Sequence, residues 1–202
     1  ATSSGRRRHL GSGTQASVPT PSVSARCERD EPRLAAAFAC FASALAFLDF
    51  EFTDFANGQC YQGQTPDFNV SGTDYCDYKG KSNQYVADYS GNLTFVYSTM
   101  VNKDIEFRGG VDFVFTGSYN SSQNLDPSQE QDAYVKSNVR LSLGDVTKGW
   151  EAAFLVKNLT DETVISYSND TPLSSSIFGS TGHYGFIETP RTYAIQATYR
   201  WY

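Results

Sequence analysis

Residues 188–202 read ETPRTYAIQATYRWY, and this stretch decides the fold of the chain. From Tyr193 to Trp201, apolar side chains alternate with smaller or polar ones at every second position. Because the side chains of a β-strand point to opposite faces in turn, the stretch predicts an amphipathic strand over 191–201. The segment 150–158, WEAAFLVKN, has the same period and predicts another such strand. Chain ends usually fray in soluble domains, whereas every strand in lipid needs two neighbours, so a closing aromatic strand is typical of an outer-membrane barrel.

Short motifs accompany both strands. The segment 154–164, FLVKNLTDETV, contains Asn-Leu-x-Asp, and residues 188–202 contain Pro-Arg-x-Tyr and then Tyr-Arg-aromatic. In these motifs the chain resembles the last two strands of the TonB-dependent outer-membrane receptors. The residues that match the family are Asn158, Leu159, Asp161, Pro190, Arg191, Tyr193, Tyr199, Arg200 and Trp201.

The resemblance also implies a C-terminal signal for the barrel-assembly machinery. Its residues are Tyr193, Ile195, Ala197, Tyr199, Trp201 and Tyr202. The family usually ends on the aromatic residue at the position of Trp201, so Tyr202 is an additional residue in this chain.

For the fold, the resemblance implies an all-β protein in which about six antiparallel transmembrane strands form one wall of a roughly 22-stranded barrel. We expect a fragment without the plug. For the function, it implies active uptake of a scarce solute of the siderophore, vitamin B12 or glycan class, with no cofactor and no enzymatic activity. The implied partners are outer-membrane lipid, the rest of the barrel with its plug, and the TonB energy-transducing complex acting through that plug.

The composition agrees with a sheet that has an apolar outer face. The chain has 202 residues, of which 40% are hydrophobic and 19% charged, and it contains 14 Phe and 13 Tyr. The mean hydropathy of −0.42 excludes a bundle of membrane helices. It does not exclude a membrane barrel, because apolar and polar residues alternate along each barrel strand and lower the mean hydropathy. The net charge of −6 argues against a nucleic acid as partner, because phosphate binding needs a basic surface.

The four cysteines are Cys27, Cys40, Cys60 and Cys76. Without Cys-x-x-Cys spacing and with only two histidines, we expect no zinc site. Cys60 and Cys76 share one polar stretch, which suits a loop disulfide in an oxidising compartment, and free thiols are the alternative.

Two regions are expected. Residues 1–33 lack any period and are rich in Ser, Gly, Thr, Pro and Arg, so we predict a disordered or unrelated segment. Residues 34–202 would be the barrel portion. The apolar run 34–50 allows three interpretations: a transmembrane helix, a signal peptide near 34–46, or a barrel strand. We favour the strand, which would run on through Asp49, Phe50, Asp54 and Phe55 into an outer loop.

Three further strands are predicted over 92–101, 105–116 and 133–143. From residue 55 onward the connections alternate between long and short, so all long loops should lie at one end of the sheet. Transmembrane barrels have this asymmetry, with long extracellular loops and short periplasmic turns. We therefore expect the bacterial outer membrane as location, with the long loops outside and the C-terminus in the periplasm.

Charged residues fall on the strand face opposite the aromatic residues. In a wide barrel this face would line a wet lumen, whereas in a sandwich it would face solvent. The expected lumen-facing residues are Glu106, Arg108, Asp112, Lys136, Arg140, Glu151, Lys157 and Arg200.

No nucleophile elbow, phosphate-binding loop or paired histidine motif occurs in the sequence. His183 is the one candidate base between 34 and 202, and we expect it to be a loop residue. Two other functions remain open: a small complete outer-membrane barrel of a structural or adhesive kind, or an extracellular β-sandwich binding module. The transported solute is not identified by the sequence.

Overall fold

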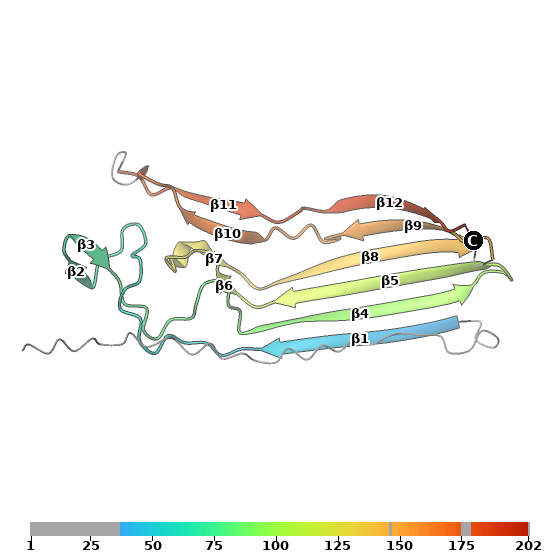
Figure 1. Cartoon of the computed structure of the whole chain (residues 1–202), viewed down its shortest axis with the longest axis horizontal. Coiled ribbons are helices and arrows are strands. Elements are labelled where there is room, and N and C mark those ends of the chain that lie inside the picture. Colours follow the sequence, from blue (N-terminus) through green and yellow to red (C-terminus); the bar gives the residue numbers. More distant parts are fainter. Residues whose placement is uncertain (1–36, 146, 175–178, 202) are drawn as a thin grey trace, which may run out of the picture.

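The computed structural model describes residues 37–145, 147–174 and 179–201. Its main element is a six-stranded antiparallel sheet with the order β1-β4-β5-β8-β9-β12 (Figure 1). The predicted all-β, antiparallel class is therefore confirmed. The six strands are β1 (Ala37–Phe47), β4 (Tyr89–Met100), β5 (Ile105–Thr116), β8 (Tyr134–Asp145), β9 (Trp150–Lys157) and β12 (Thr192–Tyr199). The predicted segment 1–33 and Tyr202 lie outside the described residues.

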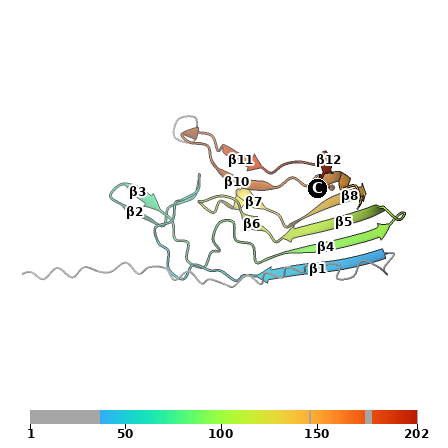
Figure 2. The ribbon, with the colours of Figure 1, turned by 45° about the vertical axis from the view of Figure 1, so that its right-hand side comes forward.

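The large sheet is open. Strand β1 pairs with β4, and β12 pairs with β9, so each of these two strands stands at an edge within the described part of the chain. Figure 2, turned by 45° from the first view, shows β1, β4, β5 and β8 side by side in one layer. Among the described residues, no second sheet packs on either face. The structure thus contains a large antiparallel sheet and not a closed barrel.

The long connections all lie at one end of the sheet, as the alternation of connection lengths predicts (Figure 1). They contain three small hairpins and a 3₁₀ turn, none of which was predicted. Residues 101–104, residues 147–149 and Trp201 lie at the opposite end. The hairpins are β2 (Phe68–Val70) with β3 (Thr73–Tyr75), β6 (Tyr119–Asn120) with β7 (Glu130–Gln131), and β10 (Ile165–Asp170) with β11 (His183–Ile187); the 3₁₀ turn is η1 (Pro127–Gln129).

Strand β1 is shorter than predicted. The apolar run is a strand where it is described, which excludes the transmembrane helix, but the strand ends at Phe47. The predicted continuation through Asp49, Phe50, Asp54 and Phe55 is wrong, because these residues lie in the loop. Phe52 N donates to Lys81 O at 3.0 Å, and Gly80 N donates back to Phe52 O at 2.8 Å. These hydrogen bonds tie the segment to its own loop instead of to β4.

Three smaller corrections concern the strand ends. Strand β9 stops at Lys157, one residue before the predicted limit, and β12 stops at Tyr199, so Arg191 and Trp201 flank it. His183 was expected in a loop but is the first residue of β11. Among the described residues, no helix is long and apolar enough to cross a membrane.

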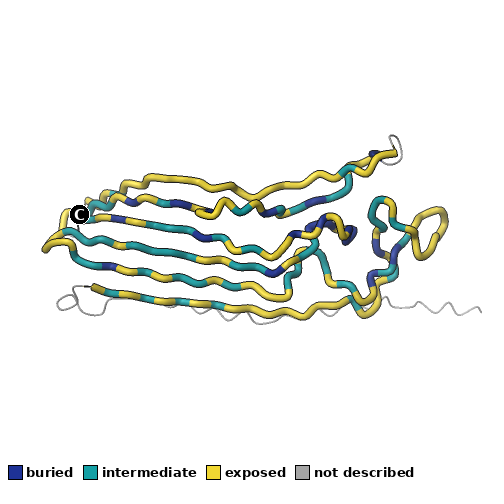
Figure 3. Tube along the Cα trace, turned by 180° about the vertical axis from the view of Figure 1, so that it is seen from behind, coloured by how far each residue is buried: buried dark blue, intermediate teal, exposed yellow. Residues whose placement is uncertain are grey.

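The buried hydrophobic cluster lies in the loops, whereas Ala153 and Val156 of β9 are the buried hydrophobic residues of the described large sheet. The buried cluster comprises Cys76, Tyr78 and Leu125, with Phe52 and Cys60 packed against it. Figure 3 shows the same distribution, with the buried residues concentrated toward the loop end and both edge strands largely exposed. Large side chains on the apolar face of the six-stranded sheet are therefore exposed and free to contact a partner or lipid.

Candidate functional site

The register of the sheet divides its residues into two chemically different faces. Directly paired residues of neighbouring strands point to the same face. One row runs Phe41, Phe95, Val111, Val139, Val156 and Tyr193 across all six strands. The large residues of this apolar face are exposed: Phe41, Leu45, Phe47, Phe95, Tyr97, Phe113, Val135, Leu141, Leu143, Phe154, Tyr193, Ile195, Tyr199 and Trp201. Ile195 is 85% exposed and Trp201 82%, whereas Val156 in the row is buried between its neighbours. No second sheet of the described chain covers the large exposed side chains of this face.

The residues expected to form a C-terminal assembly signal are on this apolar face. Tyr193, Ile195 and Tyr199 pair with Val156, Phe154 and Trp150 of β9, and Ala197 pairs with Ala152. Trp201 follows the strand and contacts Tyr199, with 5.4 Å between ring centroids.

The eight charged residues expected to face a lumen lie on the opposite, polar face or at its rim. Several are linked across strands. Arg140 Nη2 lies 3.0 Å from Glu151 Oε1, and Arg140 Nη1 donates to Gln196 Oε1 at 3.0 Å. Thr94 Oγ1 donates to Asp112 Oδ1 at 2.8 Å. The remaining members are Arg108, paired with Glu106 at 3.6 Å; Lys136, paired with Glu188; Lys157, at a shallow hollow near Asn158; and Arg200.

A hollow of about 280 Å³ lies on the polar face near the short turns. Charged and hydroxyl side chains of both signs line it: Glu106, Arg108, Ser142, Glu151, Thr198 and Arg200. Such a lining suits contact with a polar protein surface better than capture of an apolar ligand.

The Asn-Leu-x-Asp motif forms a hydrogen-bonded network with Arg191. Asn158 is 4% exposed, and its side chain accepts from Glu162 N at 2.9 Å and donates to Glu162 O at 2.8 Å. Asp161 accepts from Arg191 N at 2.9 Å and from Arg191 Nη2 at 3.3 Å. Arg191 also donates to Leu159 O, whereas Pro190 accepts from Thr192 Oγ1. The motif therefore fixes where the chain leaves β9 and where it starts β12.

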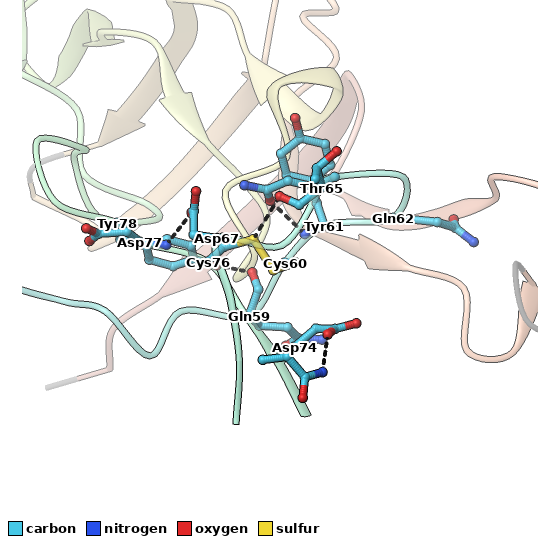
Figure 4. Close-up of a disulfide and its surroundings, with 12 residues drawn as sticks. Gln59, Cys60, Tyr61, Gln62, Thr65, Asp67, Asp74, Cys76, Asp77 and Tyr78 are labelled. Atoms are coloured by element: carbon cyan, nitrogen blue, oxygen red, sulfur yellow. Dashed lines mark hydrogen bonds between the residues drawn. A yellow bond between two sulfur atoms is a disulfide. The ribbon is translucent and has the colours of Figure 1, made fainter. Parts of the chain in front are cut away.

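The loop between β1 and β4 is closed by a disulfide between Cys60 and Cys76, across a sequence separation of 16 (Figure 4). The figure shows Tyr78 next to this bond, and the Tyr78 hydroxyl donates to Gln59 O. Burial raises the pKa of Tyr78 to about 12. This small core gives the loop a fixed shape.

The three long loops meet at the carboxylate of Asp170. Asp170 Oδ2 accepts from Gln62 N at 3.1 Å and from Asn124 Nδ2 at 2.7 Å. Its Oδ1 accepts from Gln129 Nε2 at 3.2 Å and lies 3.0 Å from His183 Nδ1. One side chain thus contacts residues from each long loop.

Sequence reasoning missed this cluster. Its members come from positions 62, 124–129 and 170–183, and no spacing within a single loop indicates that they meet. The only local signal is the sequence Asp126-Pro127-Ser128, in which Asp126 caps η1 by accepting from Ser128 N at 2.8 Å. No family model, curated protein or solved structure matches this chain in the comparisons with known proteins.

Proposed function

We propose that this sheet is a section of the wall of a TonB-dependent outer-membrane receptor, with its apolar face against lipid and its charged face toward the lumen. The observation that carries the proposal is the uncovered apolar face of a single-layer sheet. Soluble proteins rarely expose a contiguous patch of this extent, because such a patch promotes aggregation. In a bilayer the same side chains are buried by the acyl chains.

The opposite face supports the same conclusion. Charged side chains such as Arg140 and Glu151 pair with each other but keep about a third of their area exposed. They would be costly in lipid without water. A water-filled or plugged barrel interior is the environment in which both faces are satisfied at once.

The two edge strands support a larger assembly. Within the described residues β1 and β12 each pair on one side only, and an unpaired edge is not tolerated in lipid. Six strands are too few to close, since the smallest membrane barrels have about eight and this receptor class about 22. The missing neighbours would be the rest of the barrel, and the lumen-facing charges would contact its plug.

The ends of the strands mark the two membrane interfaces, and the sorting of long loops and short turns gives the orientation. Aromatic pairs stand at both ends of the apolar face: Phe47 with Tyr89 at the loop end, and Trp150 with Tyr199 at the turn end. Membrane barrels carry such aromatic girdles at the two lipid–water interfaces. We infer that the long loops face the outside and that the turns and Trp201 face the periplasm.

The transport activity rests on the resemblance of the motifs in 154–164 and 188–202, with a solute of the siderophore, vitamin B12 or glycan class. A complete small adhesive barrel would need further strands beyond the six. A β-sandwich would need a second sheet over the apolar face, and the described residues offer none.

Cell fractionation tests the location. Protein produced from its own gene in its own host should sediment with outer membranes, resist alkaline carbonate and dissolve only in detergent. Recovery in the soluble fraction would refute the proposal in favour of the sandwich.

Epitope insertion tests the orientation. A tag at residue 132, in the loop between β5 and β8, should bind antibody on intact cells. The matched tag at residue 103, in the turn between β4 and β5, should bind only after the outer membrane is opened. The reverse pattern would contradict the assigned orientation.

A further inference from the structure

We propose that the loop cluster around Asp170 binds a divalent transition-metal ion of the zinc or manganese class, with Asp126, Asp170 and His183 as ligands. One ligand atom from each of these residues lies within 4.8 Å of the other two. His183 Nε2 is 3.9 Å from Asp126 Oδ2, and His183 Nδ1 is 3.0 Å from Asp170 Oδ1. These two contacts use different nitrogens of the His183 ring, and one ion binds only one of them. With metal–ligand bonds of about 2.0–2.2 Å, a single ion can reach all three side chains once the ring or a carboxylate turns toward it.

The charge of the cluster favours a cation. The side chains of Asp126 and Asp170 are only 6% and 20% exposed. In the described part of the chain, His183 is the only ion-pair partner of either carboxylate. Two such carboxylates repel each other when both are ionised, and a bound cation removes this repulsion.

Outer hydrogen bonds hold one oxygen of each carboxylate, and the oxygen that faces His183 accepts from the Gln129 amide within the cluster. Asp126 Oδ1 is occupied by Ser128, which donates through N and Oγ, each at 2.8 Å. Asp170 Oδ2 is occupied by Gln62 and Asn124, as described above. The other oxygen of each carboxylate faces His183. Carboxylates that bind metals commonly have this division, with one oxygen on the ion and the other held by outer hydrogen bonds.

Gln129 gives an independent indication of a ligand. It is only 6% exposed, and its amide lies between the two carboxylates, with Nε2 at 3.4 Å from Asp126 Oδ2 and 3.2 Å from Asp170 Oδ1. Its Oε1 is buried without a hydrogen-bond partner. Buried polar atoms rarely stay unsatisfied. A rotation of the amide by half a turn would direct Oε1 toward the carboxylates, which is favourable only with a cation between them.

The donor set selects the class of ion. Carboxylate oxygens suit calcium, magnesium and manganese, whereas an imidazole among them favours a transition metal such as zinc. No cysteine is among the proposed ligands, so the cysteine spacing in the sequence could not indicate this site. Asp126 comes from the loop between β5 and β8, and Asp170 and His183 come from the loop between β9 and β12, so the ion would clamp these two loops together.

A calorimetric titration of the purified full chain, without an affinity tag, tests the site. The background variant is His9→Ala, because the chain has only 2 His and this substitution leaves His183 alone. We expect Zn²⁺ to bind with one saturable site. Asp170→Asn and His183→Ala should weaken binding by at least about tenfold. The matched control Asp132→Asn, at an exposed acid of the same loop as Asp126, should leave binding unchanged.

A second measurement needs no change in the cluster. In the His9→Ala protein, the one remaining imidazole should show a Zn²⁺-dependent shift of its NMR resonances, saturating at one equivalent. Absence of both the shift and saturable binding would overturn the proposal. So would Ca²⁺ binding that is unaffected by His183→Ala, because the site would then be an oxygen site. These titrations need folded loops and not a membrane location, so their failure is distinguishable from failure of the proposed function.

Discussion

Asn158 and Asp161 explain at the level of single residues why the Asn-Leu-x-Asp motif has its composition. Their φ angles are 53° and 58°, in the left-handed region that Asn and Asp tolerate better than other side chains. Asn158 in addition closes a ring with the backbone of Glu162 through its amide. A residue at this position must therefore have both the backbone tolerance and the side-chain amide.

Asn158→Ala should destabilise the protein by about 2–3 kcal/mol, because it removes two buried hydrogen bonds and forces a Cβ-bearing residue without an amide into the left-handed region. Asn158→Gly removes the same hydrogen bonds, but glycine adopts the left-handed φ without strain, so the loss of stability should be smaller. Asp161→Asn breaks only an exposed ion pair and should cost less than about 1 kcal/mol. Urea unfolding in detergent, followed by tryptophan fluorescence, measures all three. Equal effects of the three variants would contradict this explanation.

At the level of elements, the period of two predicted the six strands well. It did so because one face of each strand is mainly apolar. The pattern is most regular in β5, whose predicted limits 105–116 equal the observed ones. The pattern failed where aromatic residues serve another purpose. Phe50 and Phe52 keep a period of two after β1, yet the rings of Phe52 and Phe55 are 5.0 Å apart and Phe55 stacks on Tyr78 at 5.5 Å in the loop core.

The hairpin of β10 and β11 was missed for a related reason. Its strands are short and separated by a polar segment, so their alternation is too brief to stand out. The cluster around Asp170 was missed with it, because this hairpin brings His183 next to Asp170. Contacts between loops depend on tertiary structure, and no periodicity within one segment reports them.

The disulfide should stabilise its loop and not the sheet. It closes a loop with a sequence separation of 16, which corresponds to about 3 kcal/mol in the chain-entropy model. The Cys60→Ala, Cys76→Ala double variant should therefore become sensitive to proteases within 57–89 while the strands stay protected. Limited proteolysis with mass spectrometry identifies the cut sites. Cleavage within β4 or β5 would indicate that the loop core also supports the sheet.

Adjacent residues of β12 should respond differently to charge. Ile195→Lys puts a charge near the middle of the apolar face and should cost about 2–4 kcal/mol in a bilayer. Ala194→Lys, one residue earlier on the polar face, should cost much less. Unfolding of the native protein reconstituted in lipid vesicles gives both values. If the two variants are equally stable, the apolar face is not in lipid.

At the scale of the whole molecule, the usual roles of sheet and loops are exchanged. The sheet buries few large side chains, and the loops hold the hydrophobic core, the disulfide and the polar cluster at Asp170. This distribution is unfavourable for a sheet alone in water. It becomes favourable when lipid covers one face and further strands cover the edges.

The two tryptophans allow the placement in lipid to be measured directly. The chain has 2 Trp, and both lie at the turn end of the sheet: Trp150 pairs with Tyr199, and Trp201 follows that strand. In the proposed orientation both indoles sit at the periplasmic interface, where aromatic girdles form. Lipids brominated near the headgroup should therefore quench their fluorescence more than lipids brominated near the bilayer centre.

The control for this measurement is Trp201→Phe, which keeps an aromatic ring at this position and leaves Trp150 as the only tryptophan. Its emission should follow the same depth order, because Trp150 is at the same height along the sheet as Tyr199. Stronger quenching from the bilayer centre would move this end of the strands into the hydrocarbon and contradict the assigned span. Absence of quenching at every depth would mean that this end of the apolar face meets something other than lipid, and the barrel wall would have to be abandoned.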